Sequence, residues 1–284
     1  MEELNLSKNR FTTLNEDVFV GLTNLRVLDL SFNLLTDLQP NIFKGLTILS
    51  SLNLEMNRIQ TLHANLFSST PQLKSLTLSY NLELGKNLLQ SRDALRVVLK
   101  NNITSLIMNN MSITSLPRNI FNEGINLLHL SLADNPIKTL DILPASLETL
   151  NLSGIEIGVI LPGGFIYYPS LKKLHLDRLL YLTEVKSNAF EGLESLEVLT
   201  MENCIQLETF DEYAFGGEKD SVPVPLKLFS LARSGLHSLS SAVFSPVNST
   251  IQHVDLQGNP WECDCHLAWI KEVNFSLLDR GYLR

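Results

Sequence analysis

The chain has 284 residues, of which 44% are hydrophobic and 18% are charged, and these proportions are typical of a folded chain rather than a disordered one. Its formal net charge is −8, which disfavours a nucleic-acid partner because neutralising phosphates requires a basic surface. The sequence has no run of about 18 apolar residues, so we expect no direct insertion into a membrane.

An internal repeat organises the sequence, with a period of about 24 residues in most units. Residues 25–48 read LRVLDLSFNLLTDLQPNIFKGLTI, a Leu-x-x-Leu-x-Leu-x-x-Asn-x-Leu pattern that continues to Phe43 and Leu46. A period in this range is typical of a leucine-rich repeat, in which each unit adds one short strand to a solenoid. The leading apolar residues of the successive units are Met1, Leu25, Leu49, Leu73, Ile103, Leu127, Leu147, Leu171, Leu196, Leu226 and Ile251.

The eleven units predict an α/β solenoid of the leucine-rich-repeat type, curved and right-handed. Its concave side would be a parallel sheet of about eleven strands, and its convex side would be irregular or carry short helices. We expect a short helix from roughly Leu88 to Leu99. Residues 1–250 would form ten repeats without an N-terminal cap, and residues 251–284 would form the last strand and a truncated C-terminal cap.

Positions within each unit have distinct roles. The first, fourth and sixth positions are apolar and should point into the core, and the ninth is often an Asn that can satisfy buried backbone groups. Cys204 takes this ninth position in its unit, where we interpret it as a buried thiol. A Phe near the nineteenth position should form an aromatic spine from Phe19, Phe43, Phe67, Phe121, Phe165, Phe190, Phe215 and Phe244.

The end of the sequence carries the most specific motif. Residues 253–270 read HVDLQGNPWECDCHLAWI, and the string Asn-Pro-Trp-x-Cys-Asp-Cys-x-Leu-x-Trp resembles the cysteine-flanked C-terminal cap of extracellular leucine-rich-repeat proteins. This group includes Toll-type receptors, Slit-like proteins, neuronal adhesion receptors and lamprey variable lymphocyte receptors. The resemblance implies a secreted or cell-surface ectodomain that binds macromolecules through its concave face. It also implies that Cys263 and Cys265 pair with two further cysteines, which this sequence lacks.

Several features leave alternatives open. Met1 already fills the first apolar position of a repeat, so we expect a fragment, or a gene model without its first exon, that lacks a signal peptide. A metal site at Cys263, Cys265 and His266 would lack a fourth ligand, so we expect no metal. The candidate glycosylation sites are Asn102, Asn110, Asn248 and Asn274, and Asn248 is the one that we favour.

A candidate binding surface lies at the eighth position of three consecutive units, which holds Phe32, Met56 and Tyr80. Stacked strands would align these side chains at the edge of the concave sheet, and exposed neighbouring apolar groups of this kind form binding hot spots. The alternative is that they only pack on one another. With their polar neighbours, the predicted partner-binding residues are Asp29, Phe32, Asn53, Glu55, Met56, Thr77 and Tyr80.

The sequence therefore predicts a non-enzymatic module that binds a protein ligand, cut from a receptor or a secreted adhesion or signalling protein. The alternatives are a structural protein of the extracellular matrix and a cytoplasmic adaptor. We find no phosphate-binding loop, nucleophile motif or complete metal cluster, so we predict neither catalysis nor a cofactor. The oligomeric state, the ligand and the choice between receptor and matrix protein stay open.

Overall fold

The computed structural model describes most of the chain. It divides into two compact units, Met1–Leu147 and Glu148–Arg284. The described residues are 1–140, 142–216, 224–247, 249–262 and 269.

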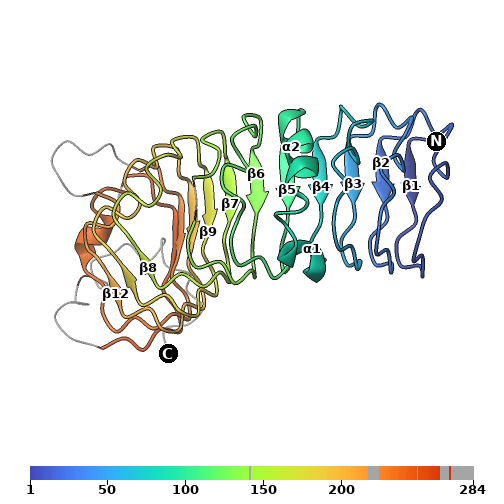
Figure 1. The fold of residues 1–284 in the computed structure, drawn as a ribbon. Coiled ribbons are helices and arrows are strands. Elements are labelled where there is room, and N and C mark those ends of the chain that lie inside the picture. The colour runs from blue at the N-terminus through green and yellow to red at the C-terminus, as the bar shows by residue number, and fades with distance from the viewer. Residues whose placement is uncertain (141, 217–223, 248, 263–268, 270–284) are drawn as a thin grey trace. The chain divides into compact units, whose positions relative to one another are not determined.

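The first unit is a stack of short parallel strands in chain order (Figure 1). Each strand has three residues, at the third to fifth positions of its repeat, and each pairs in direct register with the equivalent residues of the next repeat. The strands are β1 (Glu3–Asn5), β2 (Val27–Asp29), β3 (Ser51–Asn53), β4 (Ser75–Thr77), β5 (Ser105–Ile107) and β6 (His129–Ser131).

The second unit continues the same pattern. Its strands are again parallel and paired in direct register. Together the strands form an eleven-stranded parallel sheet, which confirms the predicted fold class and the number of strands. The second-unit strands of this sheet are β7 (Thr149–Asn151), β9 (Lys173–His175), β11 (Val198–Thr200), β13 (Leu228–Ser230) and β14 (His253–Asp255).

A second, three-stranded sheet lies within the second unit, and the sequence did not predict it. It consists of β8 (Val159–Ile160), β10 (Glu184–Val185) and β12 (Thr209–Phe210), all parallel. These strands have only two residues each, which is too short for an alternating pattern to be visible in the sequence. They form because the main sheet stacks successive repeats, which brings these segments side by side.

The helices partly match the predicted one. The coil between β4 and β5 contains α1 (Leu82–Lys86) and α2 (Arg92–Lys100), so α2 begins later than expected and α1 was not predicted (Figure 1). A β-carbon on Gly85 of α1 would clash with the backbone carbonyl of Met111, so only glycine permits this close approach. A 3₁₀ helix, η1 (Ser241–Phe244), lies in the second unit.

The aromatic spine forms in two runs. In the first unit Phe43 stacks between Phe19 and Phe67, with ring centroids 6.4 and 6.2 Å apart. Phe121 makes no ring contact within the described part of the chain, because the units on either side of it carry no Phe at the equivalent position. In the second unit the run consists of Phe165, Phe190, Phe210, Phe215, Phe229, Phe244 and Trp269.

The ninth-position side chains tie each repeat to the one before it. The buried Asn57 amide donates to the Leu30 carbonyl of the previous repeat at 2.9 Å, and the same bond recurs at Asn33, Asn81 and Asn135. Two residues that replace Asn keep this bond in the second unit.

Cys204 Sγ donates to the Leu176 carbonyl at 3.3 Å, and Ser234 Oγ donates to the Met201 carbonyl at 2.9 Å. Both carbonyls belong to the sixth residue of the preceding repeat, as they do for Asn. Burial raises the pKa of the Cys204 thiol to about 12, so the group stays protonated and able to donate. Cys204 is therefore a structural residue, as the sequence indicated.

Candidate protein-binding surface

The predicted binding residues fall on neighbouring repeats of the first unit. Asp29, Asn53 and Thr77 end β2, β3 and β4, and they pair with one another in direct register. All three are half-buried, and their side chains lie on the face of the sheet opposite the core, which we call the open face. The strands therefore place these three polar groups in a row across the sheet, about 4.8 Å from one rung to the next.

Phe32, Met56 and Tyr80 form a second row just beyond the strands, which we call the apolar row. Their exposed fractions are 44%, 40% and 40%. The backbone N–H of each donates to the next repeat, to the carbonyls of Glu55, Ser79 and Asn109, at 2.9 Å in each case. The register of the sheet thus extends to the eighth position, so the three side chains occupy consecutive rungs.

The backbone at the eighth position is left-handed, which the sequence pattern did not reveal. Here φ is 53° at Phe32, 53° at Met56 and 62° at Tyr80. The same left-handed conformation recurs at the eighth position of the other repeats, for example with φ of 58° at Lys8 and 55° at Arg233. It therefore belongs to the turn that follows each strand, and it does not by itself give the apolar row a functional role.

Acidic groups border the apolar row. Glu55 directly precedes Met56, and Asp29 lies on the preceding repeat, where its Oδ1 accepts from the N–H of Ser31 at 2.9 Å. Neither carboxylate forms an ion pair with a Lys or Arg in the described part of the chain. One cation lies beside the row, because Lys8 Nζ is 5.9 Å from the centroid of the Phe32 ring.

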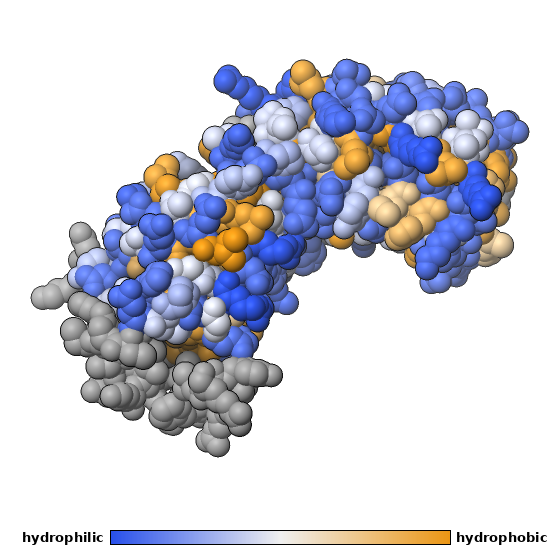
Figure 2. Space-filling model, turned by 90° about the horizontal axis from the view of Figure 1, so that it is seen from below, coloured by the Kyte–Doolittle hydropathy of each residue, from blue (hydrophilic) through white to orange (hydrophobic). Residues whose placement is uncertain are grey.

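The edge at which the chain leaves the strands carries hydrophobic side chains. In Figure 1 this is the lower edge, where α1 lies, and Figure 2 shows it from below. Over the first unit, on the right of that view, orange hydrophobic groups are set among blue hydrophilic ones.

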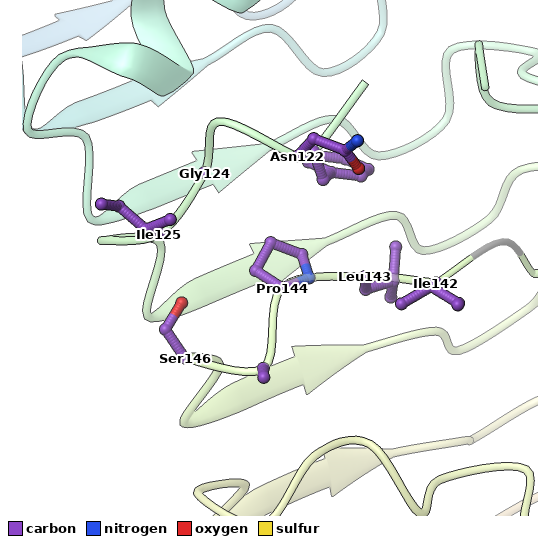
Figure 3. A pocket seen from close by; sticks show the side chains of 9 residues that line it. Asn122, Gly124, Ile125, Ile142, Leu143, Pro144 and Ser146 are labelled. Atoms are coloured by element: carbon purple, nitrogen blue, oxygen red, sulfur yellow. The ribbon is translucent and has the colours of Figure 1, made fainter. Parts of the chain in front are cut away.

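A separate pocket of about 330 Å³ lies elsewhere in the first unit (Figure 3). The pocket lies between Phe121 and the unit at residues 127–146, which is shorter than its neighbours and has no Phe. Ile125 and Ile142 at the pocket are 75% and 71% exposed. The pocket was not predicted from the sequence, although the short unit was a visible signal. Its lining is formed by Phe121, Asn122, Gly124, Ile125, Ile142, Leu143, Pro144, Ala145 and Ser146.

A hydrogen-bonded network covers part of the open face of the second unit. Thr200 Oγ1 donates to Asp177 Oδ2 at 2.9 Å, and His175 Nδ1 lies 2.9 Å from the same Thr200 oxygen. Because the hydroxyl proton points to Asp177, Nδ1 of His175 must carry the proton of that contact. Ser153 Oγ joins the network and donates to Asp177 Oδ2 at 3.4 Å, so both hydroxyl groups donate to the carboxylate rather than to His175. Within the described residues no three His, Cys, Asp or Glu side chains are placed to hold a metal ion.

The remaining predicted sites have different outcomes. Asn102 is exposed, and its Oδ1 accepts from the side chain of Asn126 at 3.3 Å. Asn110 is half-buried at the eighth position of the repeat after that of Tyr80. The sites Asn248, Asn274, Cys263 and Cys265 lie outside the described residues.

Comparison with known families matches two parts of the chain. The leucine rich repeat model matches residues 1–35 and 23–82, and the model of the BspA type leucine rich repeat region (6 copies) matches residues 146–259. The chain is built of leucine-rich repeats. The second, three-stranded sheet lies entirely within the part that matches the BspA type region. No curated protein matches the chain significantly.

Solved leucine-rich-repeat structures share the fold. TLR13 in complex with ssRNA13 is 25% identical with a TM-score of 0.61, and the alignment covers 98% of this chain and 46% of that one. Toll in the Toll–Spatzle complex of Drosophila is 17% identical with a TM-score of 0.65, covering 91% and 36%. The LRIM1/APL1C complex gives 18% identity and a TM-score of 0.63, covering 100% and 57%. The leucine-rich-repeat chain thus spans roughly a third to just over half of these proteins.

Proposed function

We propose that this chain is a non-enzymatic protein-recognition module that binds a protein ligand through the open face of β2–β4 and the adjoining apolar row. The observation that carries the proposal is the exposure of Phe32, Met56 and Tyr80 on three consecutive rungs. Large apolar side chains that are clustered, exposed and held on a rigid scaffold are the usual anchors of protein interfaces. The stacked repeats hold them in place before binding, which lowers the ordering cost of association.

The similar structures support a recognition role. Toll is solved with Spatzle, and LRIM1 with APL1C, so leucine-rich-repeat proteins of this fold form protein complexes. The TLR13 complex with ssRNA13 shows that a leucine-rich-repeat protein of this fold can have a nucleic-acid partner. The fold class therefore does not support our prediction that this chain has no nucleic-acid partner, which rests on charge alone. For this chain, the acidic groups beside the apolar row still favour a protein, because they would repel phosphates.

We also propose an extracellular or cell-surface location for the parent protein, as part of a receptor or a secreted adhesion or signalling protein. The resemblance to Toll-type receptors supports this, and so does the motif around Cys263 and Cys265 in its resemblance to an extracellular cap. In this proposal residues 1–250 form the repeats, and residues 251–284 form the last strand and a truncated cap. Within the described residues no helix is both long and apolar enough to cross a membrane.

The test is a binding screen against an array of secreted and cell-surface proteins. The wild type is compared with a variant in which Phe32, Met56 and Tyr80 are all alanine. We expect the triple variant to lose at least tenfold in affinity for the partner that the wild type selects, because hot-spot residues dominate binding. Circular dichroism of the variant should stay unchanged.

The control replaces three other exposed apolar residues of the same unit, Val18, Val20 and Leu89, with alanine. This control should bind as the wild type does. If instead the triple variant keeps full affinity for every partner while the control loses it, the apolar row is not the binding site and the proposal fails.

A further inference from the structure

The charge around the apolar row indicates what kind of partner it takes. On the open face of the first four repeats the third, fifth and seventh positions carry three acidic residues, Glu3, Asp29 and Glu55, and no Lys or Arg. Asp29 and Glu55 have no cationic partner within the described chain, whereas surface carboxylates elsewhere, such as Glu148 with Lys172 at 2.9 Å, form ion pairs. Lys8, whose Nζ lies 5.9 Å from the centroid of the Phe32 ring, offsets one of these three charges, so the surface beside the row stays net negative.

Asp29 and Glu55 are placed to act together. The N–H of Phe32 donates to the Glu55 carbonyl, which sets Glu55 opposite the residue before Phe32. Asp29 lies two residues before that opposite residue, Ser31. The Cα atoms of Asp29 and Glu55 are therefore diagonal neighbours, about 7–8 Å apart. Two cations on one face of a partner segment can reach both carboxylates at once.

The length of the apolar row favours a helix as the partner. Three rungs of a parallel sheet span roughly 10 Å, with about 4.8 Å between neighbours. On an α-helix, residues i, i+3 or i+4, and i+7 lie on one face and span about 10.5 Å. Alternate residues of an extended segment are about 6.7 Å apart, so they do not match the rungs. A helix that lays such a face on an apolar surface is a recurrent mode of recognition.

We propose that the apolar row binds a basic amphipathic helix of a partner protein, with apolar side chains on Phe32, Met56 and Tyr80 and Lys or Arg against Asp29 and Glu55. This inference rests on the proposed function, and it names the chemical class of the partner. The same charges work against an anionic partner and against a second copy of this acidic surface, because like charges placed together lower affinity and disfavour association.

The test uses two fluorescein-labelled peptides as probes. Both are about four helical turns long with Leu at i, i+3, i+4 and i+7, and their polar face carries Lys in one peptide and Glu in its twin. Fluorescence anisotropy at about 20 mM salt, where screening is weak, compares their affinities for the wild-type chain. We expect the Lys peptide to bind at least tenfold more tightly than the Glu peptide, and the difference to shrink at high salt.

Two variants separate charge from apolar contact. The Asp29→Asn/Glu55→Gln variant should bind the Lys peptide roughly threefold to tenfold more weakly, which is the effect expected for two exposed charge pairs. A matched control, Glu194→Gln/Glu208→Gln, removes the same charge from exposed sites of the second unit and should stay within twofold of the wild type. The alanine variant of the apolar row should weaken binding of the Lys peptide at any salt concentration.

The outcomes distinguish this inference from the proposed function. If both peptides bind equally well and the alanine variant weakens both, the basic class of partner is wrong and the binding site stands. If the alanine variant binds the Lys peptide as the wild type does, the site itself is wrong. Sedimentation of the free chain tests whether a second copy of the chain covers the apolar row. A dimer that the alanine variant abolishes would show that it does, and would overturn the inference of a basic helix.

Discussion

Single side chains connect the repeats, and Asn57 shows how. Its amide donates to Leu30, Leu54 and Glu55, and its Oδ1 accepts from the N–H of Leu35 at 3.1 Å. These backbone groups lie in a layer where the Asn is only 7% exposed, so water does not replace the amide. One side chain thus satisfies groups from two successive repeats.

Replacing Asn57 with Ala should therefore lower the free energy of unfolding by at least about 2 kcal/mol, because several buried backbone groups lose their partner. Guanidinium denaturation monitored by circular dichroism measures this change. Asn9 is the control, since it holds the same repeat position but is exposed and donates only to Leu6 and Ser7. Asn9→Ala should cost under about 1 kcal/mol. Equal costs at the two sites would contradict the argument from burial.

The sequence revealed the ninth-position pattern but not all its members. Asn side chains are recognisable from the repeat, and so is the unusual Cys204 that replaces one. That Cys204 and Ser234 keep the bond to the preceding repeat became visible only in the structure, since the acceptor carbonyls of Leu176 and Met201 lie 28 and 33 residues away. The distance in sequence depends on loop length, which differs between repeats.

At the scale of elements, two Phe residues of the same repeat have opposite roles. Phe43 is fully buried in the spine between Phe19 and Phe67, whereas Phe32 is 44% exposed in the apolar row. Burial decides whether a side chain contributes to folding or remains available for binding.

Phe43→Ala should lower the free energy of unfolding by about 3–5 kcal/mol, as expected for a large cavity in a stacked core. Phe32→Ala should lower it by under about 1 kcal/mol and instead weaken binding of the partner. Chemical denaturation and binding measurements on the same two variants check both effects. A large loss of stability in Phe32→Ala would show that the apolar row is a packing feature rather than a binding surface.

The elements that the sequence missed share one cause. The eleven main strands recur with the repeat, and their Leu pattern is local, so the sequence predicted them. The short strands of the second sheet, such as β8, have no pattern of their own and form because stacked repeats bring them together. The contact of Gly85 in α1 with Met111 of the next repeat has a similar origin, and α2 begins at Arg92, after the turns that follow α1.

At the scale of the whole molecule, stability should be approximately the sum of repeats and their interfaces. Removing residues 49–72, which form one complete repeat, leaves the next repeat in the correct phase to stack on Leu25 and its neighbours. We expect this deletion to keep a folded, cooperative solenoid with a lower denaturation midpoint. It should also lose affinity for the partner, because Met56 is removed from the apolar row.

The control deletes only residues 49–60, which form half a repeat, and so places apolar positions where polar ones belong. Circular dichroism and denaturation curves should show that this second deletion abolishes cooperative unfolding. If both deletions behaved alike, the repeats would not be interchangeable stacking units.

The sequence by itself determined the repeat, its parallel strands and the residues that face the core, because these depend on a pattern that recurs in every unit. It also indicated the apolar row, since three large apolar residues share one position. Only the tertiary structure decided that the row is exposed, that its backbone is left-handed, and that Asp29 and Glu55 border it without cationic partners in the described chain. Those properties depend on what the neighbouring repeat places beside each residue, and no single repeat contains that information.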